Sequence, residues 1–470
     1  MRRFELILAG CCAGAIAWPA LFGSRPRRGL VFLGTLGATV AQLVIEGFRW
    51  QMIPLYMVAI GLGLGDLLSL ERNFPWWRRL SRPALGLIGL GMMTLLPAVL
   101  PVPVLPTPSG PLEVGTVSLP LTFPDRLEQY GAEPDLHSRR IMVQVWYPAD
   151  VPDGAISGPW SDDVDVVGPA LSRRLGFPGF FLSHTRYTSD HSVASAPPLS
   201  GRFPVVIYSH GWTGFRTIAV NQAESLASHG YVVVAPDHTF AAISTRFPDG
   251  TVVDLDPQAL PPRESVEEEV YDQAGTDLVA TLTDDLVGIL NALEAGEAGA
   301  FGEIASHTDL GLVGVFGHSS GGGAAVQLCL IDLRCKAVLG MDAWVEPVPD
   351  RVIATPATRP MLFIRSDGWR GTPNDGRLRG MAERSENRTY WIGIDGASHN
   401  DFVLAPLFSP IAARLGLKGP IPAGRIIPII DRFLVGFFDH TLLGTGAAAI
   451  EQNPFDEVTL EVIGQWSEAS

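Results

Sequence analysis

The sequence contains few cysteines, and none of them is spaced for a zinc site. Only four Cys occur in 470 residues, with no C-x-x-C pair and no Cys/His cluster of the kind that binds structural zinc. We therefore expect no bound metal. Cys11 and Cys12 lie in an apolar stretch, whereas Cys329 and Cys335 are six residues apart. These last two either form a disulfide, which is typical of proteins outside the cytoplasm, or remain two buried thiols.

Positive charge is scarce in most of the chain. Residues 1–105 contain ten Arg, no Lys and four acidic residues, so they carry +6. Because the formal net charge is −15, the other 365 residues carry −15 − 6 = −21. A region this acidic repels phosphate backbones. The charge balance therefore excludes nucleic acid as a partner.

The first 105 residues lack a clean cleavage site, which argues against a secretory signal peptide starting at Arg2 and Arg3. They hold four apolar segments instead, at residues 4–22, 29–47, 52–70 and 84–104. Each is roughly long enough to cross a bilayer core of ~30 Å, although prolines interrupt the end of the fourth. We predict a small all-α bundle of three to four transmembrane helices over residues 1–105, in a multi-pass membrane protein.

The arginines in the short loops predict the orientation of this bundle, because they concentrate on the cytoplasmic side. Seven lie on one side and three on the other: Arg25, Arg27, Arg28, Arg72, Arg78, Arg79 and Arg82, against Arg2, Arg3 and Arg49. With four spans the larger domain is then extracytoplasmic, whereas three spans would change the answer. Ionisable residues lie near segment ends and not at their centres, so anchoring to the bilayer is favoured over transport.

For the remainder of the chain we predict a Pro-rich linker at 106–111 and a globular domain at 112–460. Short apolar runs alternate with helical patterns, which is typical of a mostly parallel sheet covered on both faces. We predict an α/β fold, and an irregular stretch at 150–200 is the candidate cap over a site. The predicted strands are residues 114–119, 141–146, 205–208, 231–235, 310–316, 336–341, 361–365 and 390–394, and the main helices are 218–228, 264–294, 324–331 and 428–442.

A Gly-His-Ser-Ser-Gly motif at residues 317–321 follows one of these strands and opens a helix. A serine that stands exposed on such a tight turn crowds the positions two before and two after it, and glycine relieves the crowding. The motif alone also occurs by chance in a chain with 51 Gly. In this context it predicts Ser319 as a nucleophile.

His399 is the best candidate for the base, because it follows the last predicted strand, where the chain order Ser, acid, His of hydrolases places it. Two aspartates end suitable strands and could orient the imidazole. Asp342 follows residues 336–341, and Asp367 follows residues 361–365. The pattern leaves this choice near even, with Asp395 as a weaker third candidate.

An oxyanion hole needs two backbone N–H donors. One is expected from Ser320, directly after the nucleophile. The other is expected from the loop at 209–214, where the N–H of Trp212 is the best candidate and neighbouring glycines allow a close approach.

Taken together, these segments resemble the platelet-activating factor acetylhydrolase family of the plasma and intracellular α/β-hydrolase kind. The similarity lies in residues 208–217, in residues 317–322, in the Met-Asp-Ala-Trp of 341–344 and in residues 398–402, within a match of about 112–445. The family takes its acid from the Asp-Ala-Trp segment, so the resemblance favours Asp342 over Asp367. It does not cover the apolar N-terminal segments.

The resemblance implies an α/β-hydrolase fold and hydrolysis of short or oxidised acyl esters, including those of phospholipids, without a cofactor. The alternatives are a broad carboxylesterase or polyester hydrolase with the same three residues. The non-enzyme alternative is a membrane receptor or scaffold built on a hydrolase fold. The presence of Ser319, Asp342 and His399 argues against this alternative.

Overall fold

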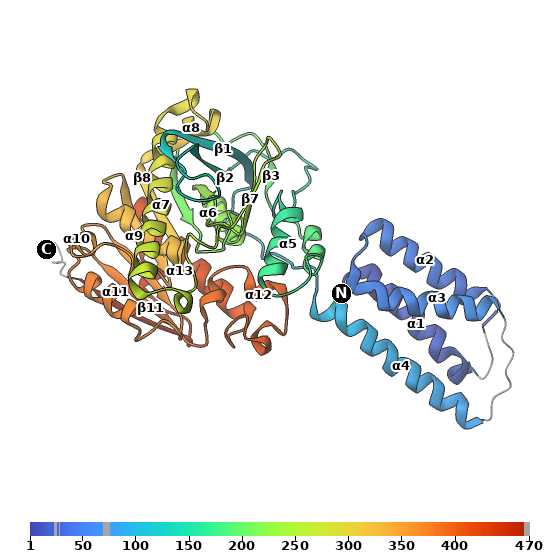
Figure 1. Cartoon of the computed structure of the whole chain (residues 1–470). Helices are drawn as coiled ribbons and strands as arrows, with labels where there is room; N and C mark the ends of the chain where they lie inside the picture. Colours follow the sequence, from blue (N-terminus) through green and yellow to red (C-terminus); the bar gives the residue numbers. More distant parts are fainter. Residues whose placement is uncertain (23–25, 28, 69–75, 465–470) are drawn as a thin grey trace. The chain divides into compact units, whose positions relative to one another are not determined.

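The computed structural model describes residues 1–22, 26–27, 29–68 and 76–464. Contacts divide the chain into two compact units (Figure 1). The helical unit consists of Met1–Val104 with two short later segments, Leu182–Thr188 and Leu407–Ile411. The sheet unit contains the rest of the chain from Leu105 onward. Part of the predicted cap at 150–200 therefore packs with the helical unit, while the helix α5 (Val164–Arg174) stays in the sheet unit.

The helical unit holds four helices, α1 (Arg3–Phe22), α2 (Leu30–Ile45), α3 (Ile53–Leu67) and α4 (Trp76–Val99). Three stretches could cross a membrane by length and composition, namely Arg3–Phe22, Trp50–Leu67 and Ser81–Val99, whereas α2 is shorter. Large apolar side chains cover the outside of this unit, including Leu6, Leu33, Met57, Leu85 and Met92. Arg25, Arg28 and Arg72, used above for orientation, lie outside the described residues.

A buried ion pair joins the helices of this unit at one end. The Arg49 Nη2 and Glu5 Oε2 atoms are 2.6 Å apart, and both side chains are fully buried. Arg49 also donates to the carbonyl of Leu100 at 2.8 Å, beyond the end of α4. Arg49, counted above among the loop arginines, is therefore buried and paired. A buried charge needs such partners because water no longer solvates it.

The sheet unit is built on one ten-stranded sheet in the described part of the chain. Its strands are β1 (Val114–Leu127), β2 (Ser138–Pro148), β3 (Val193–Ala194), β4 (Phe203–Ser209), β5 (Val232–Asp237), β8 (Thr308–His318), β9 (Cys335–Met341), β10 (Met361–Arg365), β11 (Thr389–Ile394) and β12 (Val458–Ile463). Their order in the sheet is β12-β11-β10-β9-β8-β4-β5-β2-β1-β3. The central strands β5, β4, β8, β9, β10 and β11 run parallel. Antiparallel neighbours flank them: β1 and β2 on one side, and β12 (Val458–Ile463) on the other. The sequence analysis missed β12, although four of its six residues are β-branched (Val458, Thr459, Val462 and Ile463), a composition typical of strands.

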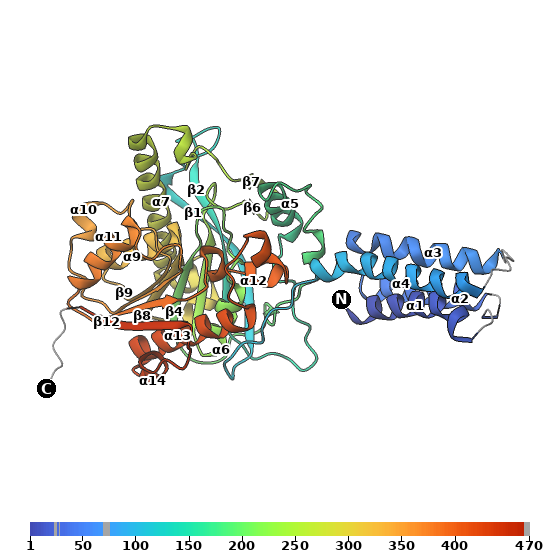
Figure 2. The ribbon, with the colours of Figure 1, turned by 90° about the horizontal axis from the view of Figure 1, so that it is seen from below.

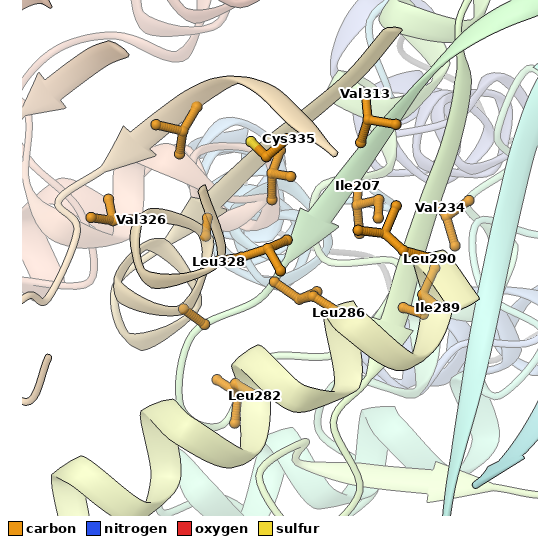
Figure 3. Close-up of a cluster of buried hydrophobic side chains, with 14 of the residues drawn as sticks. Ile207, Val234, Leu282, Leu286, Ile289, Leu290, Val313, Val326, Leu328 and Cys335 are labelled. Carbon is orange, nitrogen blue, oxygen red and sulfur yellow. The ribbon is translucent and has the colours of Figure 1, made fainter. Parts of the chain in front are cut away.

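Helices cover both faces of this sheet (Figure 2). On one face lie α7 (Glu268–Glu294) and α9 (Ser320–Ile331), and on the other α6 (Val220–Ser228) and α13 (Ala423–Leu443). Residues alternate between the faces, as a strand requires. Figure 3 shows the first face, where Ile207 and Val313 of the sheet meet Leu286 and Leu290 of α7. On the opposite face, Tyr208 and Phe316 pack against each other and Phe316 against Phe438 of α13.

The parallel strands bring their carboxyl ends to one edge of the sheet, which is where α/β proteins place their ligand sites. Each strand that matters for the site is followed by a candidate residue, directly in the case of Ser319 and Asp342 and within a short loop in the case of Trp212, Asp367 and His399. These strands are β4 (Phe203–Ser209), β8 (Thr308–His318), β9 (Cys335–Met341), β10 (Met361–Arg365) and β11 (Thr389–Ile394).

Candidate active site

Ser319 lies on a strained turn between β8 and α9. Its φ of 57° and ψ of −125° are values that side-chain-bearing residues rarely adopt. The turn is held by backbone hydrogen bonds, from Ser319 N to Met341 O at 3.1 Å and from Trp344 N to Ser319 O at 2.9 Å. Ser319 is half-buried at the head of a helix. The turn thus has the form of the strand-to-helix elbow expected from the motif.

The two glycines of the motif are required by close backbone contacts. A Cβ on Gly317 would lie 2.4 Å from the carbonyl oxygen of Gly321, and a Cβ on Gly321 would lie 2.2 Å from that of Ser209. These distances are too short for any side chain. The start of α9 therefore packs directly on the backbone of the loop after β4, which brings Ser319 next to that loop.

Asp342 begins the loop after β9 and contacts His399. The His399 Nδ1 and Asp342 Oδ2 atoms are 3.0 Å apart, and Asp342 is buried. Ser366 donates to the same carboxylate twice, from its N–H to Oδ1 at 2.8 Å and from its hydroxyl to Oδ2 at 2.6 Å. These donors stabilise the charged carboxylate, which in turn can hold the imidazole in one tautomer.

The two other candidate acids turn toward solvent. The carboxylate of Asp367 pairs with Arg370 and accepts the N–H of Gly396 at 2.7 Å, and the side chain is 50% exposed. Asp395 also pairs with Arg370, at 2.8 Å. Neither has a recorded contact with His399 in the described part of the chain. The structure therefore brings Asp342 to His399, and not Asp367 or Asp395.

A short turn after β11 presents His399, in the 3₁₀ segment His399–Phe402. The Asp401 carboxylate fixes this turn by accepting the N–H of Ser398 at 2.8 Å and that of Gly419 at 2.6 Å. The side chain of His399 remains 32% exposed. The turn is thus rigid at its base while the ring stays accessible.

Two further side chains pack on His399, and the sequence analysis assigned neither to the site. Trp369 stacks on the His399 ring with centroids 4.9 Å apart and planes 7° from parallel. His318 lies with its ring centroid 4.3 Å from that of His399. His318 Nε2 also contacts the carbonyl oxygen of His399 at 2.9 Å. Burial lowers the pKa of His318 well below its usual value, so the ring is neutral and donates this bond.

The two predicted oxyanion donors are adjacent in space. The N–H of Trp212 donates to the hydroxyl of Ser320 at 2.8 Å. Gly211 packs closely on the turn at Ser319, where a Cβ on Gly211 would lie 2.8 Å from the Cβ of Ser319. In this structure the Trp212 amide is therefore already hydrogen-bonded to the Ser320 hydroxyl.

Cys329 and Cys335 lie close together where α9 passes to β9. Their Cα atoms are 5.1 Å apart, within the range that a disulfide spans. Cys11 and Cys12 belong to α1 of the helical unit.

The parallel sheet, the two helical layers and the serine turn at the carboxyl edge define an α/β-hydrolase fold. A solved structure of a ferulic acid esterase from Streptomyces cinnamoneus superposes with a TM-score of 0.62 at 24% identity, over 77% of this chain and 99% of that one. At the level of sequence, the model of platelet-activating factor acetylhydrolase, isoform II, matches residues 105–445. The chain belongs to this family.

Curated relatives carry the same family name. The platelet-activating factor acetylhydrolase of Gallus gallus is 23% identical over 267 residues, which are 51% of this chain and 62% of that protein. The dog enzyme (Canis lupus familiaris) is 24% identical over 333 residues, or 66% of this chain and 73% of its own. The chain thus spans less than two thirds of the length of the chicken relative.

Proposed function

We propose that this protein is a serine ester hydrolase with Ser319 as nucleophile, His399 as general base and Asp342 as the orienting acid. The contact that carries the proposal is the one between His399 Nδ1 and Asp342 Oδ2 at 3.0 Å, made by residues 57 positions apart. It occupies Nδ1 and leaves Nε2 as the nitrogen that accepts the serine proton. The neighbour of Ser319, His318, touches the same imidazole.

The proposed reaction proceeds in two stages through a covalent acyl-enzyme. His399 takes the proton of Ser319 as its oxygen attacks the ester carbonyl, and then returns that proton to the leaving alcohol. Water next attacks the acyl-enzyme, with His399 again accepting and donating a proton, and the free acid leaves. The buried carboxylate of Asp342 stabilises the imidazolium that forms in each stage.

The developing oxyanion would be held by the backbone N–H groups of Trp212 and Ser320. The Trp212 amide donates to the Ser320 hydroxyl at 2.8 Å. This hydrogen bond must break before the amide can donate to the oxyanion. Rotation of the Ser320 side chain would release the amide.

Short or oxidised acyl esters, including those of phospholipids, are the proposed substrates. Membership of the platelet-activating factor acetylhydrolase family supports this choice. Three apolar stretches with the length to cross a bilayer support a multi-pass anchor that keeps the enzyme near lipid. A broad carboxylesterase or polyester hydrolase is the second candidate, since the same three residues serve all of these reactions.

A receptor or scaffold without activity is disfavoured by the strain at the serine. A φ of 57° at Ser319 costs about 1–3 kcal/mol, which a purely structural turn has no reason to retain. The same argument applies to the buried carboxylate of Asp342 beside the imidazole of His399. Its desolvation lowers stability, and a purely structural role does not require it.

We further propose that the sheet unit is extracytoplasmic and that Cys329 and Cys335 form a disulfide there. This orientation requires α2 (Leu30–Ile45) to cross the bilayer as a shorter fourth span beside the three longer stretches. With four spans, the arginine distribution of the helical unit supports an extracytoplasmic sheet unit, and the 5.1 Å separation of the two Cα atoms supports the disulfide. An oxidising location is what such a bond requires.

The nucleophile can be tested with Ser319→Ala in the full-length protein in detergent. We expect kcat for p-nitrophenyl acetate to fall by about 10⁵-fold or more, because the alanine cannot form the acyl-enzyme. A fluorophosphonate should label wild type at Ser319, located by peptide mass spectrometry, and should not label the variant. Retained hydrolysis by Ser319→Ala, with unchanged thermal unfolding, would refute the proposal.

The acid can be tested by comparing Asp342→Asn with Asp367→Asn. The first should lower kcat by about 10³–10⁴-fold, because the amide no longer stabilises the imidazolium or fixes its tautomer. The second should leave kcat near wild type, since Asp367 pairs with Arg370 on the surface. A larger loss in Asp367→Asn would assign the acid to the later strand.

The substrate class can be tested with p-nitrophenyl esters of acetyl, butyryl and longer chains, and with vesicles holding phospholipids whose second acyl group is acetyl, oxidised and truncated, or long. We expect fast release of acetyl and truncated groups from the vesicles and slow release of long ones. Equal rates on soluble esters, with the vesicle lipids left intact, would favour the broad carboxylesterase.

The disulfide can be tested by alkylating denatured protein with and without reductant, followed by mass spectrometry. Cys329 and Cys335 should react only after reduction, whereas Cys11 and Cys12 should react in both conditions and serve as the internal control. Protease added to intact cells should cleave the sheet unit. Free thiols at 329 and 335, together with protection from protease, would place this unit in the cytoplasm.

A further inference from the structure

A second Ser-His-Asp arrangement lies buried behind the oxyanion loop, defined here as residues 209–214. It consists of Ser209 at the end of β4, His238 directly after β5 (Val232–Asp237) and Asp285 in α7. All three side chains are fully buried. The Ser209 Oγ and His238 Nε2 atoms are 2.9 Å apart, and the His238 Nδ1 and Asp285 Oδ2 atoms are 3.0 Å apart.

The charges around this chain of hydrogen bonds determine its protonation. Asp285 is paired with the guanidinium groups of Arg139 and Arg126, at 2.6 and 3.0 Å. Burial by itself raises the pKa of Asp285, but Arg139 and His238 outweigh it and hold the pKa well below its usual range. Burial lowers the pKa of His238. Asp285 is therefore charged and His238 is neutral, with its proton on Nδ1, so the hydroxyl of Ser209 donates to Nε2.

His238 also connects to the oxyanion loop through its backbone. Its N–H donates to Nε2 of His210 at 3.1 Å, which places the proton of the His210 ring on Nδ1. That nitrogen donates to the carbonyl oxygen of Gly211 at 2.8 Å. Burial lowers the pKa of His210 to about 3, in agreement with a neutral ring.

The loop is thus fixed within one residue of the amide that the reaction needs. Ser209 bonds to His238 directly, and Gly211 is connected to it through the ring of His210. The peptide after Gly211 carries the N–H of Trp212. On the other side, Gly321 packs against the carbonyl oxygens of Ser209 and His210, and Gly211 against Ser319. Any shift of Ser209 or His210 therefore moves the Trp212 amide relative to the nucleophile.

We propose that Ser209, His238 and Asp285 are positioning residues, which hold the Trp212 N–H where the oxyanion forms. This inference rests on the proposed function. The buried serine is not a second nucleophile, because its oxygen has no access to substrate and its hydroxyl is committed to His238. The arrangement stabilises the transition state through the loop, since an error of about 1 Å in the placement of such a donor costs about a hundredfold in rate.

The test uses Ser209→Ala in the full-length protein, with Ser385→Ala as the matched control. Ser385 is also a fully buried hydroxyl in the sheet unit and contacts the carbonyl of Ala357, and within the described residues it has no hydrogen bond to the oxyanion loop. For p-nitrophenyl acetate we expect Ser209→Ala to lower kcat by about tenfold to a hundredfold with little change in KM. The rate of fluorophosphonate labelling at Ser319 should fall in parallel. Ser385→Ala should retain both rates.

A second variant, His238→Phe, interrupts the same chain at its centre. If the chain acts as one unit, the double variant with Ser209→Ala should lose no more kcat than His238→Phe alone, because coupled residues are not additive. If His238→Phe does not fold, as judged by circular dichroism, Ser209→Ala alone decides. Wild-type kcat and labelling in Ser209→Ala would overturn this inference. Absence of labelling in the wild type would instead overturn the proposed function itself.

Discussion

The structure depends on one place where two backbone segments touch without a side chain between them. At the turn after β8, Gly321 packs on the carbonyl oxygens of Ser209 and His210, while Ser319 holds a φ of 57°. This contact places the serine, the helix N-terminus behind it and the loop after β4 in a fixed relation. The strain at Ser319 is tolerated because backbone bonds to Met341 and Trp344 hold it on both sides.

The rest of the sheet unit supplies partners to this turn. Parallel strands bring Asp342 and His399 to the same edge, and the N–H and hydroxyl of Ser366 both donate to the Asp342 carboxylate. The buried charges in the interior are paired as well. Arg139 pairs with Glu128 and Asp285, and Asp285 also contacts His238. Buried charge of this kind is tolerable only when it is matched, and here the matching also fixes the loops.

The helical unit follows a different principle. Its outer surface is apolar and its buried polar groups, chiefly Glu5 and Arg49, satisfy one another at one end. Such a distribution is unfavourable in water and favourable in a bilayer. An esterase of the proposed kind would benefit from a bilayer anchor, because lipid esters partition into the membrane and are scarce in solution.

The sequence by itself determined the fold class, most strands and the serine, because hydrophobic periodicity and a glycine-flanked turn are local signals. It left Asp342 and Asp367 near even until a family resemblance favoured one, since both follow strands of the same kind. Only the tertiary structure brings Asp342 to His399, turns His318 toward the site, adds Trp369 and Ser366, and joins Ser209 to Asp285. Such contacts link residues far apart in the chain, and the local sequence pattern does not indicate which of these side chains will be in contact.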